Sequence, residues 1–490
     1  MRAPSDELFS LIKSLTASEK RYFKIWASKH VVGKSNHYEK LFDAIDILPD
    51  DKPYDEAAFK KNLRGKSYGK YLRDEKSNLK EILLKSMRVY HAEKTTEGKL
   101  SEMLQEIRFL YSKGLMDSCR SLIDKAYKLA DEREQYEVKL QLIRFKTLTN
   151  TSAYDNQRIE KNKEWELCTR ETIDKIERER KGYSLRERIY LLYYGRQLDK
   201  NGNAVKELYD QIEQLEQEKN RSFLTFQYAI NAKVAILEYR KQYEESALLY
   251  KKLINAWEQS EWRINEQPER FESIVRNCLI QIWRAEKFED MPPLLEKIKS
   301  IQTSDPLVSA NIMIQYWQLS IVYYINTQQY KEAYTLLPAL QKGLKEYKGK
   351  LQFQNKVNMI NNICIVYLKN ADYKGLLHSI EDIYTIIDKR PEYNYVLREI
   401  KYLEFIAQFE TGGIDILDNF IRNAHRFFKD NKLNCSYSDW LWKQLKLLTT
   451  CESGKVKQIR SQIKKQLAST PHPTDYESIT ELVGDWLNPH

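Results

Sequence analysis

The feature that most constrains this chain is an aromatic residue that recurs at the start of helix-forming segments. Tyr243, Phe288, Tyr330 and Tyr373 are separated by 45, 42 and 43 residues, and Ile414 continues the series after another 41. Each follows a strongly apolar segment and a short polar turn. Within the segments, apolar residues fall three and four positions apart, which is a helical spacing. A fixed period of this size predicts a stack of helical hairpins, an α-solenoid.

The composition agrees with a helical chain. Only 15 glycines and 12 prolines interrupt 490 residues, while 31 % of the residues are charged and 42 % are hydrophobic. Few helix breakers and many charges favour helices with solvated outer faces around a substantial core. We therefore expect an all-α fold, a right-handed α-α superhelix of about seven or eight hairpins with an N-terminal helical bundle. The expected domains are a basic bundle over 1–95, repeats over 98–430 and a helical cap over 431–490.

The N-terminal region contains clear helix signals. Thr16 and Glu19 form a capping-box pattern, with a hydroxyl at the cap and a carboxylate three residues later. A long basic helix is expected over 71–91. Four apolar residues define its expected packing side: Leu72, Leu79, Leu83 and Met87.

Two later regions fit the period less closely. Between 135 and 235, helix starts are expected near Tyr154 and Asn203, and the mixed charges of 177–188 are expected to project into solvent. After residue 431 the pattern weakens, as is usual where a solenoid must end its core. Five apolar residues are expected to close the stack: Trp440, Leu441, Trp442, Leu445 and Leu448.

Two segments carry a family resemblance. Tyr243-Glu244-Glu245-Ser246-Ala247 and Tyr330-Lys331-Glu332-Ala333-Tyr334 each place an aromatic residue at the start of a second helix, with a small residue four or three later. In this they resemble tetratricopeptide (TPR) repeats. The period is longer than that family's usual length of about 34 residues, and longer helices explain the difference. A bundle followed by such repeats also resembles, in layout, peptide-regulated bacterial regulators of the Rap type.

The resemblance implies a binding surface, because the first helices of TPR-like hairpins line the inner groove. Amide side chains recur in those helices here, and an amide donates and accepts hydrogen bonds at once, as a peptide backbone requires. Alternatively, these amides satisfy carbonyl groups between helices or face water. Arg276 would add a clamp for a carboxylate. The predicted amide set is Asn277, Asn311, Gln315, Asn355, Asn358 and Asn362.

A second candidate surface is the basic segment 57–91. It holds ten Lys or Arg against three acids, a net charge of +7. Such a segment binds phosphates when its cations are free, and tyrosines beside them stack on bases. Alternatively, it is a solvated helix face paired with acids elsewhere. The residues predicted to form a nucleic-acid patch are Lys60, Lys61, Arg64, Lys66, Lys70 and Arg73.

Motifs for catalysis are weak in this chain. Gly-Lys-Ser occurs at 33–35 and 65–67, but neither site has the earlier glycine of a phosphate-binding loop. The seven histidines lack metal-ligand spacing, and the six cysteines lie far apart with no CxxC pair. We expect no cofactor, no metal and no enzyme activity. The N-terminus has no apolar leader and no stretch is long enough to span a bilayer, so a soluble cytoplasmic protein is expected.

The leading hypothesis from the sequence is a non-enzymatic scaffold or adaptor that binds a protein or peptide in the groove of a TPR-like solenoid. The alternative is a nucleic-acid-associated regulator that uses the basic N-terminal helices.

Overall fold

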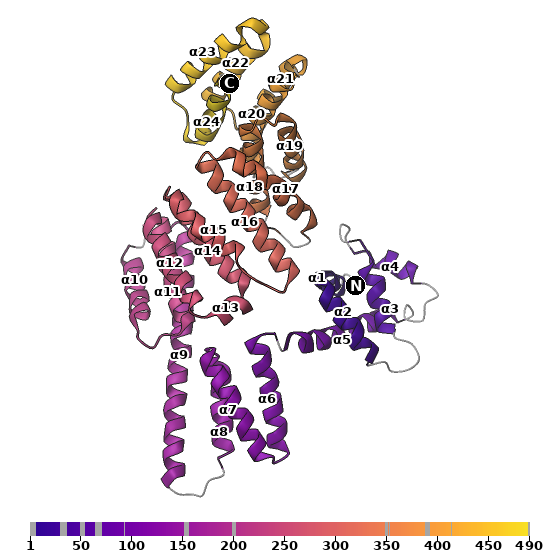
Figure 1. The fold of residues 1–490 in the computed structure, drawn as a ribbon, viewed down its shortest axis with the longest axis vertical. Coiled ribbons are helices and arrows are strands. Elements are labelled where there is room, and N and C mark those ends of the chain that lie inside the picture. The colour runs from indigo at the N-terminus through magenta and orange to yellow at the C-terminus, as the bar shows by residue number, and fades with distance from the viewer. Residues whose placement is uncertain are drawn as a thin grey trace. The chain divides into compact units, whose positions relative to one another are not determined.

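The computed structural model describes most of the chain. The described ranges are 6–29, 37–49, 54–63, 71–92, 94–150, 156–197, 202–347, 351, 353–387, 393–412 and 414–488. These residues form 24 α-helices and contain no strand, which confirms the all-α prediction (Figure 1). The chain divides into two compact units: unit 1 is Met1–Glu286 with Ser300–Ser309, and unit 2 is Lys287–Lys299 with Ala310–His490. The predicted division at 95 and 430 stays a prediction.

Unit 1 begins with five helices whose ends are set by local capping. The predicted capping box is present, because the Thr16 amide donates to the Glu19 carboxylate at 2.7 Å and the Glu19 amide donates to the Thr16 hydroxyl at 3.2 Å. Asp55 caps the fourth helix through two backbone amides. The five helices are α1 (Glu7–Ser14), α2 (Ala17–Lys29), α3 (His37–Asp46), α4 (Glu56–Asn62) and α5 (Leu72–Ala92).

The long basic helix α5 contributes its apolar side to the core of this bundle. It packs against α2 and α3, and its buried residues include all four predicted ones, Leu72, Leu79, Leu83 and Met87. Phe23 and Phe42 lie in the same core with ring centroids 4.7 Å apart, and both are fully buried. Burying each ring stabilises the fold by roughly 2–3 kcal/mol.

The rest of unit 1 is a run of helices that pack against the next helix in the sequence or the next but one. Figure 1 shows α6, α7 and α8 side by side, and α11 and α12 pair in the same way. These helices are α6 (Thr96–Ser112), α7 (Met116–Glu132), α8 (Tyr136–Leu148), α9 (Asn156–Tyr194), α10 (Gly202–Gln217), α11 (Phe223–Tyr239), α12 (Tyr243–Glu258), α13 (Glu261–Glu266) and α14 (Pro268–Arg284).

Helix α9 differs from the expectation for its charged segment. The expected helix starts are close, since α9 begins at Asn156 and α10 at Gly202. The segment 177–188, however, faces solvent only on one side, since Glu177, Arg180 and Lys181 are exposed while Leu185 is buried. It packs against α11, with Leu185 buried and the Arg186 guanidinium 4.9 Å from the Tyr228 ring. The charged side chains masked a buried apolar stripe that continues at Ile189.

The sequence period corresponds to a repeated backbone turn. Two residues before each recurring aromatic, and before Ile414, one residue adopts a left-handed conformation. At Lys241, φ is +60°, and the next amide donates to the Leu237 carbonyl at 2.9 Å, which closes the helix end. Four of the five positions are not glycine, so glycine could not signal these turns. The five are Lys241, Glu286, Gln328, Ala371 and Gly412.

Unit 2 continues with helices that also pack against sequence neighbours from α17 onward. Its bounds are α15 (Met291–Lys299), α16 (Pro306–Asn326, from Ala310), α17 (Tyr330–Glu346), α18 (Phe353–Lys369), α19 (Tyr373–Ile387), α20 (Asn394–Glu410), α21 (Ile414–Asp430), α22 (Ser436–Thr450), α23 (Val456–Ser469) and α24 (Glu477–Trp486).

The C-terminal end of unit 2 is built around aromatic rings. Trp442 is fully buried and stacks on Tyr402 with centroids 4.4 Å apart. Trp486 packs edge-on against Phe409 at 5.7 Å. Four of the five residues predicted to close the stack are buried, namely Leu441, Trp442, Leu445 and Leu448. The fifth, Trp440, is partly buried against the same core.

Candidate functional site

The predicted amide residues fall on both units. Arg276 and Asn277 lie in unit 1, and the other five lie in unit 2. Asn358 is exposed and Gln315 is buried, with 6 % of its surface accessible. The remaining four amides are half-buried: Asn277, Asn311, Asn355 and Asn362.

Arg276 already holds a carboxylate of its own helix. Its Nε donates to Glu272 Oε1 at 3.0 Å, and its Nη2 donates to the Ser273 hydroxyl at 3.1 Å. Burial raises the pKa of Glu272, which is only 3 % exposed, and the charge of Arg276 opposes that rise. The guanidinium therefore neutralises an internal charge, and a ligand carboxylate would have to compete with Glu272 for it.

Asn358 stands at the edge of a small pocket within unit 2. The pocket has a volume of about 140 Å³ and lies among α18, α20 and the segment that leads into α24. The Asn358 side chain accepts a hydrogen bond from Gln354 Nε2 at 2.9 Å, and the same nitrogen lies 3.3 Å from the Tyr395 hydroxyl. The pocket is lined by Val357, Asn358, Asn361, Tyr395, Val396, Arg398, Glu399, Asp475 and Ile479.

Two buried polar atoms in the lining have no partner among the described residues. They are Asn361 Oδ1, an acceptor, and Arg398 Nε, a donor. The rest of the Arg398 guanidinium is engaged, because Nη2 donates to the Asp475 carbonyl at 2.7 Å and the group stacks 4.6 Å from the Tyr476 ring. Leaving such a buried group unpaired costs about 1–3 kcal/mol, so a ligand that pairs both atoms would gain binding energy.

Glu399 supplies the pocket's carboxyl group. Burial raises its pKa, although hydrogen bonds from Asn361 and Ser478 and the charge of Arg398 oppose the rise. Within the described residues no cation lies at ion-pair distance from Glu399, whereas Arg398 Nη1 lies 3.6 Å from Asp475 Oδ2. Among the described residues, Asp475 therefore has an ion-pair partner and Glu399 has none.

Sequence reasoning found Asn358 and missed the groups beside it. Asn358 and Asn361 are three residues apart, so a helix places them on one face, and this spacing was a usable signal. Arg398 and Glu399 carried no such signal. Arg398 reaches Asp475 across 77 residues of sequence, and periodicity reports only neighbours along the chain.

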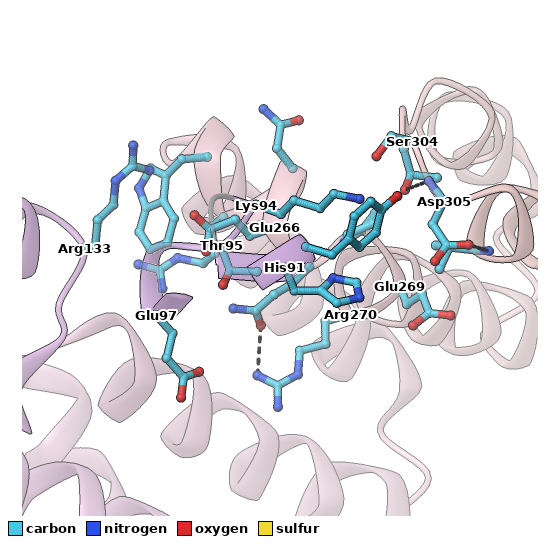
Figure 2. A pocket seen from close by; sticks show the side chains of 18 of the residues that line it. His91, Lys94, Thr95, Glu97, Arg133, Glu266, Glu269, Arg270, Ser304 and Asp305 are labelled. Carbon is cyan, nitrogen blue, oxygen red and sulfur yellow. Dashed lines mark hydrogen bonds between the residues drawn. The ribbon is translucent and has the colours of Figure 1, made fainter. Parts of the chain in front are cut away.

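Unit 1 contains a larger pocket of about 700 Å³, and Figure 2 shows its lining. Its charged groups have both signs, and several satisfy one another. Glu266 accepts hydrogen bonds from the Thr96 amide and hydroxyl at 3.1 and 2.6 Å, and His91 contacts Glu19 at 2.7 Å. Glu266 and Glu19 are therefore already partnered by groups of the pocket itself.

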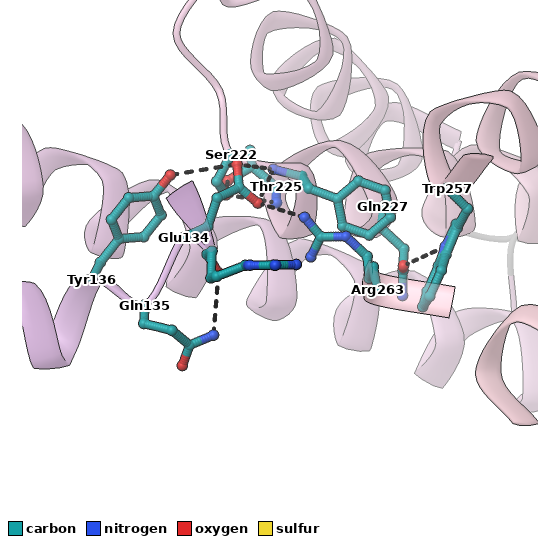
Figure 3. Close-up of polar contacts among 10 residues, drawn as sticks. Glu134, Gln135, Tyr136, Ser222, Thr225, Gln227, Trp257 and Arg263 are labelled. Carbon is teal, nitrogen blue, oxygen red and sulfur yellow. Dashed lines mark hydrogen bonds and ion pairs between the residues drawn. The ribbon is translucent and has the colours of Figure 1, made fainter. Parts of the chain in front are cut away.

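A polar network close to this pocket joins helices that are distant in sequence (Figure 3). The Glu134 carboxylate accepts from the Phe223 amide at 3.0 Å, at the start of α11, and from Arg263 Nη2 at 3.1 Å. The Arg263 guanidinium also lies 3.8 Å from the Phe223 ring. Glu134 thus serves as a tertiary cap, because a carboxylate is stabilised at a helix N-terminus.

Glu179, on α9, is the unpaired acid of this region. Burial and the charges of Glu134 and Glu137 raise its pKa to about 7, although a hydrogen bond with Ser222 and the charge of Arg180 oppose the rise. Its Oε1 is buried and has no partner among the residues that the structure describes.

The predicted nucleic-acid patch is only partly described. Arg64, Lys66 and Lys70 lie outside the described residues. Lys60 is exposed but pairs with Glu56 at 3.2 Å. Lys61 and Arg73 are exposed and form no ion pair within the described part of the chain. Other lysines of the segment also pair with acids: Lys76 with Glu56, Lys80 with Glu7 and Lys85 with Glu81.

Other predicted motifs add little. Both Gly-Lys-Ser motifs, at 33–35 and 65–67, lie outside the described residues. Among the residues that are described, no group of three or more His, Cys, Asp or Glu could hold a metal ion. In the same part of the chain, no helix has the length and apolar character to cross a membrane. None of the six cysteines, all of which lie in the described part of the chain, forms a disulfide.

No family model, curated protein or solved structure matches this chain. The evidence for its function is therefore the chemistry of its own residues.

Proposed function

We propose that this chain is a non-enzymatic scaffold or adaptor, built as a right-handed TPR-like solenoid, that binds a protein or peptide on the first helices of its hairpins. The repeated left-handed turn supports the hairpin architecture, because it recurs with the same period as the aromatic residues. In such a stack each hairpin buries its apolar side against its neighbours and leaves the first helices available for binding.

The observation that carries the proposal is the pocket beside Asn358. It offers a buried acceptor, Asn361 Oδ1, and a buried donor, Arg398 Nε, both unpaired among the described residues. Every peptide unit of an extended ligand supplies one N–H and one C=O, except before proline. One residue of an extended ligand directs its N–H and C=O to the same side, as in a hydrogen-bonded pair of strands, so it can pair with both atoms while the exposed amide of Asn358 contacts a neighbouring residue.

The test uses an array of immobilised 12-residue peptides and the full-length chain. We expect saturable binding to a subset of the peptides, weakened roughly tenfold by Asn361→Ala, which removes the acceptor. Asn358→Ala should weaken binding less, because that side chain is exposed. Asn326→Ala is the control, since Asn326 is an exposed amide on α16.

Two results would contradict the proposal. One is the absence of saturable binding to any peptide. The other is equal binding by Asn361→Ala and by the Asn326→Ala control, since the pocket would then not contribute.

Nucleic-acid binding by the N-terminal helices stays the alternative. Lys61 and Arg73 are the described residues on which it depends, because Lys60 is already paired with Glu56.

A further inference from the structure

The charges around the unit 2 pocket do not cancel within the described residues. Arg398 lies within 3.6 Å of Asp475, which accounts for one cation and one anion. Glu399 is the remaining charged group of the lining, and its carboxyl accepts from the Ser478 hydroxyl at 3.5 Å. One positive charge beside Glu399 would bring the net charge of the pocket lining to zero. A buried carboxylate gains most from a cation that also donates hydrogen bonds.

The acceptors beside Glu399 match such a group. Asn361 Oδ1 is buried without a partner among the described residues, while hydrogen bonding from the same side chain stabilises the Glu399 carboxylate. A lysine ammonium has three donors and no acceptor. Asn361 Oδ1 has two lone pairs, so it can accept from the ligand backbone N–H and also from the ammonium. Glu399 and Asn361 Oδ1 then take two of the three ammonium donors, and the third can reach water at the pocket mouth.

The volume limits what can enter. About 140 Å³ corresponds to a few water molecules, each of which occupies roughly 30 Å³ in the liquid. The end of one side chain fits, and a larger ligand would have to remain mostly outside. A compact ammonium on a slender stem suits this space better than a planar guanidinium with five donors, because Arg398 already forms part of the wall.

We propose that this pocket takes the ammonium group of a lysine side chain carried by an extended peptide partner, with Glu399 and Asn361 accepting its hydrogen bonds. This inference rests on the proposed function, because the peptide backbone supplies the carbonyl that accepts from Arg398 Nε. It adds the chemical identity of the anchoring residue. The partner is thus a peptide segment with an accessible lysine, flanked by residues that keep the backbone extended.

The experiment is an array of 12-residue peptides with random flanks and one fixed central residue, which is Lys, Arg, norleucine or Glu. Norleucine keeps the apolar stem of lysine and removes the charge. We expect central Lys to give binding at least roughly tenfold tighter than norleucine, because a charge-assisted hydrogen bond is lost. Arg should fall between the two, and Glu should bind most weakly.

Variants of the pocket test the assignment in both directions. Glu399→Gln keeps the shape and should remove the preference for Lys over norleucine. Asn361→Asp adds a second carboxylate and should increase that preference. Glu381→Gln is the control, because Glu381 is an exposed acid on α19. Far-ultraviolet circular dichroism and the urea midpoint show that each variant is folded.

Free amines test the source of the ammonium group. Butylamine and spermidine should compete only at concentrations far above those of the peptides, since they lack the backbone that pairs with Arg398. Competition at concentrations similar to those of the lysine peptides would overturn the assignment to a peptide.

The outcomes separate the two proposals. Saturable peptide binding without a preference for Lys, or a preference that survives Glu399→Gln, would overturn the lysine assignment and leave the scaffold proposal standing. Binding to no peptide at all would overturn both.

Discussion

Glu179 gives a sharp test of how unit 1 is packed, because its carboxyl is buried with one oxygen unpaired among the described residues. We predict that Glu179→Gln stabilises the protein at pH 8 and has little effect at pH 5. The pKa of Glu179 is raised from 4.5 to about 7 in the folded chain. The folded state therefore prefers the protonated carboxyl, which the amide of glutamine resembles.

The sign of this pH dependence follows from the number of protons that the folded and unfolded states bind. Between pH 4.5 and pH 7 the unfolded chain has lost the proton of Glu179 while the folded chain retains it, so the free energy of unfolding falls as the pH rises. Above about pH 7 the folded chain carries the full free-energy cost of the ionised Glu179 carboxylate. The difference between the two pKa values corresponds to roughly 3 kcal/mol. Because the group is only partly shielded from solvent, screening reduces the expected effect of the substitution to ~2 kcal/mol.

The assay is urea unfolding of Glu179→Gln and of the unsubstituted chain at pH 5 and pH 8. The free-energy difference between the two proteins should grow by ~2 kcal/mol from the lower to the higher pH. Glu171→Gln on the same helix is the control, since Glu171 is exposed. A difference that is constant with pH, or one matched by the control, would refute the interpretation that Glu179 is a buried acid opposed by Glu134 and Glu137.

Three further predictions concern the unit 2 core, one of the repeated turns and the basic surface. Trp442→Ala should destabilise unit 2 by about 3–5 kcal/mol, because it removes a fully buried ring. A urea unfolding midpoint equal to that of the unsubstituted chain would contradict this. Ala371→Gly should stabilise the protein by roughly 0.5–1 kcal/mol, because φ is +56° at this position and the relief of left-handed strain exceeds the entropy cost of glycine. A lowered melting temperature would count against the assigned turn. If the N-terminal helices bind nucleic acid, charge reversal of Lys61 and Arg73 should abolish a steeply salt-dependent affinity for DNA or RNA, and binding that does not vary with salt would remove that alternative.

Much of the fold could be predicted from the sequence, because helical hairpins are specified by neighbours along the chain. The capping box at Thr16 and the packing face of α5 appear as expected. The 41- to 45-residue period corresponds to a repeated turn at Lys241 and its equivalents. Each of these features is a spacing of residues along the chain, so the sequence alone reveals them.

The features that escaped prediction depend on distant residues. Glu134 caps α11 from 89 positions away, and Arg398 meets the segment before α24 across 77. The charged stretch around Glu179 looked solvated because acidic and basic residues hide the apolar stripe that α11 covers. For the same reason the sequence indicated Asn358 and did not indicate Glu399, whose role depends on which groups surround it in three dimensions.

The most direct measurement of the central claim is site-specific photo-crosslinking. Benzoylphenylalanine in place of Asn358, at the mouth of the pocket, should capture a bound array-selected peptide covalently. The same group in place of Asn326 should capture little. Binding at this pocket predicts crosslinks from position 358 to the central residues of the peptide. Equal capture from both positions, or capture only from position 326, would contradict it.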